Sequence, residues 1–175
     1  AAFVYDWANV VRQAIADEAA SLQPELAKNP DAFKRFLQCF DEMEAVLACV
    51  PEFRLDSWER QARAKAGARG ARAFRRMITT WRDPAAKSRK INDYARREYA
   101  GLMGGYYKKR WEALAVCTDE AGRLDKPRFT DAIRRLERDF WENGAAKPLP
   151  WKLRTVNEAA WSLKGWQREA YSLGN

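Results

Sequence analysis

The chain has 175 residues, with 32 lysines and arginines against 24 aspartates and glutamates, a net charge of +8 and no histidine. This length allows one domain with a hydrophobic core. The absence of histidine excludes the Ser-His-Asp and Cys-His catalytic arrangements and the H-E-x-x-H zinc site. Any catalysis by this chain alone would need carboxylates, Lys, Tyr or Cys.

The cysteine pattern argues against a metal or disulfide framework, and the apolar pattern argues against a membrane span. Cys39, Cys49 and Cys117 each lie in an apolar helical pattern without a C-x-x-C pair, which indicates buried thiols rather than a zinc or disulfide framework. We therefore predict no metal and no other cofactor. No run approaches the roughly 20 apolar residues that span a bilayer, and Asp6 interrupts the opening residues. We expect no membrane span, and a chain cut or processed from a longer one whose targeting signal lies upstream.

The first two predicted elements are amphipathic helices, because apolar residues recur at spacings of three and four. The first runs from Phe3 to about Leu22. The second follows Asn29, which can cap it, with Pro30 in the tolerated first position, and it ends at Pro51.

Three further helical patterns follow. A short helix after Asp56 gives way to a turn at Gly67 and Gly70, and the next helix covers about residues 71–81. Residues 91–114, "INDYARREYAGLMGGYYKKRWEAL", have the pattern of a single helix rich in rings and charges.

Two more helices complete the prediction. "RFTDAIRRLERDFWE" is amphipathic after a polar loop, and Thr155 can cap a last helix that carries several tryptophans. No run alternates as a strand requires. The sequence therefore predicts an all-α fold, with residues 1–175 as a single domain of about seven helices.

Three ordered landmarks resemble a known family. "MITTW" followed by "INDYARREYAGLMGGYYKKRW" resembles the C-terminal helical domain of glycoside hydrolase family 89, the α-N-acetylglucosaminidases. The opening "YDWANVVRQAIADEA" and the segment "FRLDSWERQARAKA" resemble two earlier parts of that domain. The resemblance spans Tyr5 to Trp111.

The resemblance implies a role inside a larger enzyme. Family members combine a small N-terminal domain, a central (β/α)8 barrel and this helical domain, and remove terminal α-linked N-acetylglucosamine from glycans. The two carboxylates of the retaining mechanism belong to the barrel, and nothing in this chain matches their motifs. We therefore expect no catalytic residue in this chain and no activity when it is isolated. The expected partners are the barrel of the same polypeptide and the glycan, in a secreted or periplasmic protein.

The resemblance also implies substrate-binding residues. Ile91 and Tyr94 match positions that line the sugar subsite, and Trp81 matches a neighbouring family tryptophan. An aromatic ring offers a sugar a flat apolar face and a polar handle, although both rings can instead pack the loop onto the helices. The sequence departs from the family pattern at three nearby positions: Arg82, Asn92 and Tyr99.

Charged and small residues near these substrate-binding positions suggest two further contacts. Lys87, Arg89 and Lys90 can steer an anionic glycan toward the pocket mouth, unless they form only a solvated loop. Gly101 and Gly105, four residues apart, allow another element to approach the backbone closely. They are candidates for the contact with the barrel, with packing inside this domain as the alternative.

A basic run supports a different class of function. Residues 60–76 hold seven arginines or lysines and no acid, which would suit a free-standing helical module that binds nucleic acid or another polyanion. Acids are interleaved with bases elsewhere, and no helix-turn-helix or zinc-finger signature is present. We therefore keep polyanion binding as the alternative and expect no nucleic-acid partner.

Overall fold

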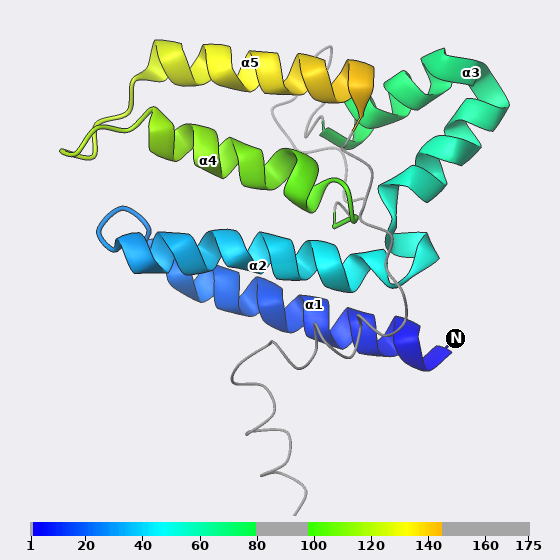
Figure 1. Ribbon diagram of the computed structural model, residues 1–175, viewed down its shortest axis with the longest axis horizontal. Helices are drawn as coiled ribbons and strands as arrows, with labels where there is room; N and C mark the ends of the chain where they lie inside the picture. Colours follow the sequence, from blue (N-terminus) through cyan, green and yellow to red (C-terminus); the bar gives the residue numbers. More distant parts are fainter. Residues whose placement is uncertain (1, 80–97, 145–175) are drawn as a thin grey trace, which may run out of the picture.

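The computed structural model describes residues 2–79 and 98–144, and these residues form helices without any strand (Figure 1). The all-α prediction is confirmed. Five α-helices occur in the described ranges, rather than the about seven expected over the whole chain. The two helices predicted on either side of Gly67 count together as α3, although Ala66 and Gly67 between them have non-helical backbone angles. The helix expected from Thr155 lies outside the described residues.

Helices α1 (Ala2–Leu22) and α2 (Pro30–Ala48) lie side by side, joined through the short helix η1 (Gln23–Glu25). The Asn29 side chain accepts hydrogen bonds from the backbone N–H groups of Asp31 at 3.0 Å and Ala32 at 3.2 Å. The predicted cap with Pro30 in the first position is therefore confirmed. Between the two helices lies the first core cluster, which includes Ile15, Met43, Val46 and Leu47.

Helix α3 (Leu55–Thr79) follows the short helix η2 (Pro51–Phe53) and contains a sharp bend. Gly67 has a φ of 59°, in the region that glycine tolerates, so the predicted turn is present as a kink within one helix. Near the bend the two halves approach closely. A Cβ on Gly70 would lie 2.5 Å from the carbonyl oxygen of Ala62.

Residues 91–114 are predicted to form one helix, but the described part of this stretch is not helical from its start. Helix begins only at Met103, with the π-helix η3 (Met103–Lys108) leading into α4 (Lys109–Val116). Before it, Ala100 is extended and donates its N–H to the Phe53 carbonyl at 2.8 Å, while Leu55 donates its N–H to the Ala100 carbonyl at 2.9 Å. Pairing with a distant segment and a φ of 95° at Gly101 prevent an earlier helix start.

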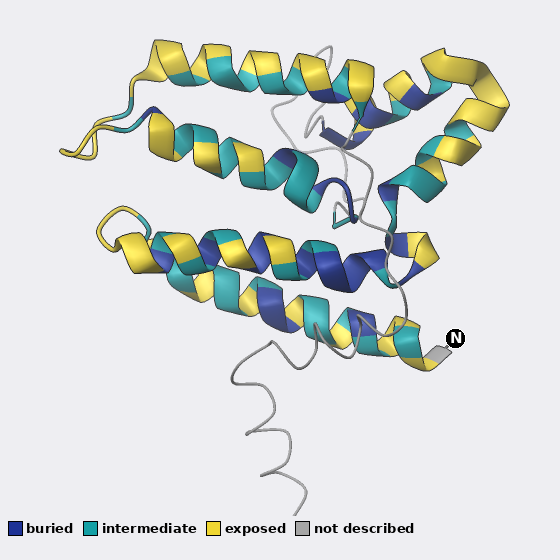
Figure 2. Ribbon diagram, viewed as in Figure 1, coloured by how far each residue is buried: buried dark blue, intermediate teal, exposed yellow. Residues whose placement is uncertain are grey.

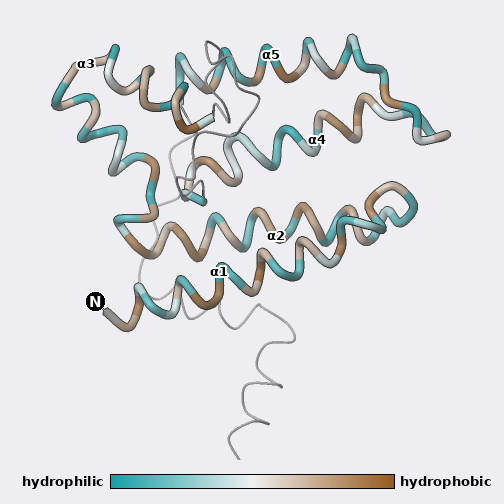
Figure 3. Tube along the Cα trace, turned by 180° about the vertical axis from the view of Figure 1, so that it is seen from behind, coloured by the Kyte–Doolittle hydropathy of each residue, from teal (hydrophilic) through white to brown (hydrophobic). Residues whose placement is uncertain are grey.

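Helix α5 (Lys126–Asn143) packs against α4 and α3, and Asp125 caps it by accepting the Arg128 backbone N–H at 3.0 Å. A second core cluster forms here from α3, η3 and α5, with the preceding Leu102. Its buried members are Leu55, Ile78, Leu102, Tyr106 and Phe140. Figure 2 shows these inward faces as buried, and Figure 3 shows hydrophobic and hydrophilic residues alternating within each helix, as amphipathic helices require.

Candidate functional site

The residues predicted to contact sugar fall in one segment, residues 80–97, and lie outside the described residues. They are Trp81, Ile91 and Tyr94 for the pocket wall and Lys87, Arg89 and Lys90 for steering. The structure describes the residues on both sides of this segment: Thr79 precedes it and Glu98 follows it. These two ends show how the fold holds the predicted wall.

The end at Thr79 is fastened to the last turn of α5. The Thr79 side chain is buried and its hydroxyl accepts a hydrogen bond from the Trp141 indole N–H at 2.8 Å. The same hydroxyl donates to the Arg75 carbonyl at 2.9 Å. Ile78, beside Thr79, belongs to the second core cluster. The last turn of α3 therefore has both apolar packing and a polar link to α5.

Arg75, whose side chain is only 4% exposed, strengthens this junction because its guanidinium caps the end of α5. It donates to the Trp141 carbonyl at 2.6 and 2.9 Å and to the Glu142 carbonyl at 2.9 Å. These carbonyls have no partner within a helix that ends there, so the cation satisfies them and the helix dipole together. Glu59 lies 3.4 Å from the guanidinium; burial raises the pKa of the Glu59 carboxyl, and the nearby Arg75 charge opposes that rise.

The end at Glu98 is held by three elements. Glu98 forms an ion pair with Arg12 of α1. Two residues later, Ala100 is fully buried and forms the bridge to the Phe53 and Leu55 backbone. Residues 98–100 are therefore held in place between α1 and the start of α3.

Glu44 of α2 completes this end by accepting two backbone N–H groups. One carboxylate oxygen accepts the N–H of Gly101 and the other accepts the N–H of Gly104 at 3.0 Å. Burial raises the pKa of Glu44, whereas the two N–H groups act to lower it. Gly101 is buried and points its N–H into the domain, and Gly105 lies partly buried within η3. Their predicted contact with the barrel stays a prediction.

Glu44 and Arg75 were not singled out in the sequence, although a signal exists for each. Glu44 lies on the apolar face of α2, three residues before the buried Leu47. Arg75 lies three residues before the buried Ile78. A charged residue on a buried helix face needs a polar partner, so both positions indicated a polar contact. Periodicity alone cannot identify the partner.

The cysteines behave as buried thiols, as predicted, with Cys39 and Cys117 buried and Cys49 partly buried, and no disulfide links them. Burial raises the pKa of Cys39 to about 11. Within residues 2–79 and 98–144, no group of three or more His, Cys, Asp or Glu side chains is arranged to hold a metal ion. None of the described helices is long and apolar enough to cross a membrane.

Three arginines at the end of the basic run contact α5. Arg75 is buried against α5, Arg72 pairs with Glu142 at 2.5 Å, and Arg76 lies over the Trp141 ring at 5.4 Å. The other four basic residues, Arg60, Arg63, Lys65 and Arg69, are exposed, so polyanion binding stays the alternative hypothesis.

The comparisons with known proteins agree with the resemblance and extend it. The family described as alpha-N-acetylglucosaminidase (NAGLU) C-terminal domain matches residues 1–163, well beyond Trp111. Human alpha-N-acetylglucosaminidase is 30% identical over 159 residues, and the match covers 79% of this chain but 21% of the human protein. No solved structure matches the chain. The helical fold, the sequence landmarks and this match over nearly the whole chain together show that the chain belongs to the family of α-N-acetylglucosaminidase C-terminal domains.

Proposed function

We propose that this chain is the accessory helical part of a retaining exo-α-N-acetylglucosaminidase, packing on the catalytic barrel and forming part of its sugar pocket. The observation that carries the proposal is the family match over residues 1–163, combined with a chain that spans about a fifth of the human relative. A piece of that size supplies part of an enzyme. The catalytic carboxylates are assigned to the barrel of the same polypeptide.

Within this proposal, Trp81, Ile91 and Tyr94 form one wall of the pocket for a terminal α-linked N-acetylglucosamine. The fastened ends at Thr79 and Glu98 support this role. Binding residues that act from a connecting segment need a rigid scaffold on both sides to keep their geometry. Lys87, Arg89 and Lys90 steer anionic glycans in the same proposal.

Packing on the barrel is supported by apolar side chains on the outer face of α1. Phe3 is 78% exposed and Val10 is 64% exposed. They are seven residues apart and therefore lie on one side of the helix. Two exposed apolar side chains on one helix face suit coverage by another part of the enzyme. Gly101 and Gly105 remain candidates for the same contact. We also propose a secreted or periplasmic location for the full-length protein.

The test uses the full-length polypeptide with an aryl α-N-acetylglucosaminide as substrate. We expect hydrolysis by the parent with release of the α-anomer first, as retention requires. Tyr94→Ala should lower kcat/KM by at least about tenfold, with a smaller loss in Tyr94→Phe, which keeps the ring. Unchanged melting temperatures serve as the folding control. A parent without activity on any α-hexosaminide, or a Tyr94→Ala variant at the parental rate, would contradict the proposal.

A further inference from the structure

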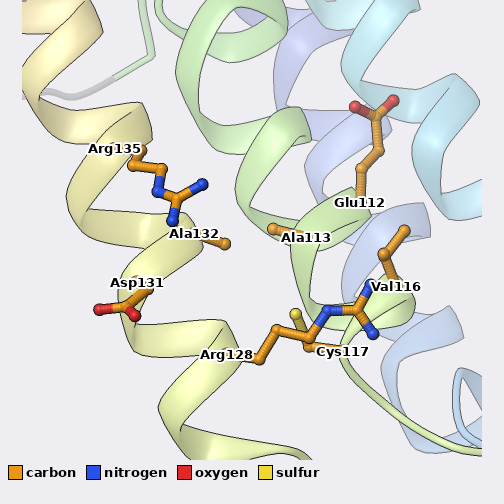
Figure 4. A pocket seen from close by; sticks show the side chains of 8 residues that line it. All are labelled: Glu112, Ala113, Val116, Cys117, Arg128, Asp131, Ala132 and Arg135. Atoms are coloured by element: carbon orange, nitrogen blue, oxygen red, sulfur yellow. The ribbon is translucent and has the colours of Figure 1, made fainter.

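Two surface grooves formed by described residues differ in the chemistry of their lining. The groove between α4 and α5, of about 610 Å³, is lined by Glu112 and Asp131 as well as by Arg128 and Arg135 (Figure 4). Because these lining residues have charges of both signs and include no aromatic side chain, they select no particular class of ligand. The second groove, of about 200 Å³, is lined by residues of α1, α2, η3 and α4, and we call it the apolar groove.

The lining of the apolar groove consists mostly of apolar side chains from elements that are distant in sequence. The larger ones are Ile15, Phe36, Phe40, Met43, Met103 and Trp111. The rings of Phe36 in α2 and Trp111 in α4 meet edge to face, with 4.8 Å between their centroids. Among the described lining residues only Glu98 is charged, and it is paired with Arg12. The groove therefore offers apolar surface and no unpaired charge to whatever covers it.

The extent of the groove along α1 sets a requirement for its occupant. The lining residues at the end of this helix run from Ile15 to Gln23, which is about 12 Å or roughly two helical turns. A helix packed against a groove of this length needs apolar residues on two successive turns, at spacings of three and four.

A segment of this chain beyond the described residues has that pattern. The sequence predicts a helix from Thr155, and apolar residues recur in it at strictly alternating spacings of three and four. They are Val156, Ala159, Leu163, Trp166, Ala170 and Leu173. This repeat places all six residues on one helix face, and such a face is typical of a helix that packs against other helices.

Two observations connect this segment to the apolar groove. The match to the family of C-terminal domains extends to residue 163, so the beginning of the segment belongs to the same domain. Residues 145–154 connect it to Gly144, the cap of α5. A connection of that length reaches at most about 33–36 Å, more than twice the radius of gyration of about 14 Å expected for a domain of this size. The segment can therefore reach the groove.

The other part of the chain outside the described residues suits the groove less well. Residues 80–97, "TWRDPAAKSRKINDYARR", contain Pro84 and many charges, and apolar residues do not recur in them at helical spacing. Burying such a segment against a lining without a free charge would leave its charges unpaired, which is unfavourable.

We propose that residues 156–173 of this same chain cover the apolar groove as a helix, with Leu163, Trp166 and Ala170 in contact with its lining. These three residues span seven positions, about the two turns that the lining along α1 provides. The inference concerns packing within the domain and does not depend on the proposed enzymatic activity.

The test identifies what lies over the groove by photo-crosslinking in the full-length polypeptide. The photoreactive amino acid p-benzoylphenylalanine replaces Gln23, an exposed residue of the groove lining, and crosslinked peptides are located by mass spectrometry. The control position is Ser21, which is exposed and outside the lining. A mixture of nitrogen-15-labelled and unlabelled protein distinguishes crosslinks within one molecule from crosslinks between two copies.

We expect crosslinks from position 23 to residues 156–173 of the same molecule, and at least about tenfold fewer of them from position 21. Crosslinks from position 23 mainly to residues 80–97, to the barrel or to a second copy would overturn the assignment. So would equal yields from the two positions. This map is obtained with the segment itself unchanged, so it decides the occupant even if a variant of the segment fails to fold.

A pair of segment variants tests which face is in contact. Leu163→Asp with Trp166→Asp places two charges on the apolar face, whereas Trp161→Asp with Ser172→Asp places the same charges on the opposite face of the predicted helix. We expect the first variant to lower the crosslink yield at least about tenfold and the second to stay within about twofold of the parent. Equal losses in the two variants would contradict the proposed contact.

Discussion

Replacing Glu44 by alanine tests whether this side chain holds the end of the predicted pocket wall. The change leaves the N–H groups of Gly101 and Gly104 without their acceptor. Each buried donor left without an acceptor lowers the free energy of unfolding by about 1–3 kcal/mol. Part of this loss is offset, because the variant no longer buries a carboxylate. We therefore expect the free energy of unfolding to fall by about 2 kcal/mol, or roughly 4–8 °C in melting temperature. Glu44→Gln keeps one acceptor oxygen and should lose about half as much.

The assay is urea unfolding of the 175-residue chain, followed by circular dichroism. Asp41→Asn is the matched control, because Asp41 also links α2 to η3 through Lys108 at 2.7 Å but is 59% exposed. An exposed pair of this kind contributes about 0–1 kcal/mol. A Glu44→Ala variant no less stable than Asp41→Asn would refute the reasoning.

The pH dependence of stability provides a second readout for Glu44. Burial raises its pKa above the ordinary value of 4.5, so the folded protein binds this proton more tightly than the unfolded chain does. The stability that is linked to binding this proton is then fully present below about pH 4.5 and is lost as the pH rises through the raised pKa. Glu44→Gln should remove this part of the slope. A parent and variant with parallel profiles over that range would contradict the assigned direction.

Three further predictions concern the bend in α3, the junction with α5 and the thiols. Gly70→Ala should lower the free energy of unfolding by about 1–3 kcal/mol, since its Cβ would lie 2.5 Å from the Ala62 carbonyl oxygen; a more stable variant in urea unfolding would show that the bend relaxes. Arg75→Met should cost about 3–5 kcal/mol, because it uncaps α5 and removes the cation beside the partly buried Glu59 carboxylate. The exposed Arg72→Gln should cost less than about 1 kcal/mol, and equal losses in thermal melts would contradict this. Cys39, with a pKa of about 11, should react with a maleimide at pH 8 only after unfolding, and rapid labelling of the native chain, located by mass spectrometry, would argue against its burial.

Local sequence signals were sufficient where the decisive contact is also local. Asn29 followed by Pro30 predicted the start of α2, and the side-chain cap is present, because the donors it serves lie two and three residues away. Gly67 likewise predicted a break, since a positive φ is a property of one residue. The sequence did not show how closely the two halves approach each other at Gly70.

Local signals failed where the partner is distant in the chain. Residues 98–102 have a helical pattern, but Ala100 pairs with Phe53 and Leu55 and Gly101 donates to Glu44, more than forty residues away. Periodicity contains no information on such pairs. The candidate site shows the same division. Family motifs indicated Trp81, Ile91 and Tyr94, whereas the side chains that fasten the ends of that segment came only from the structure.

The two core clusters also differ in how far apart their residues lie along the chain, which bears on the order of folding. Most of the first cluster comes from α1 and α2, which are joined by a short turn, with Ala100 added from a distant segment, whereas the second cluster gathers Leu55, Ile78, Leu102 and Phe140. Long loops must close before the second cluster gains its packing, so the α1–α2 hairpin should form early and the α3–α5 junction late. The Thr79 end of the predicted pocket wall therefore belongs to the last part to fold, whereas the Glu98 end is held by α1 and α2, which form early.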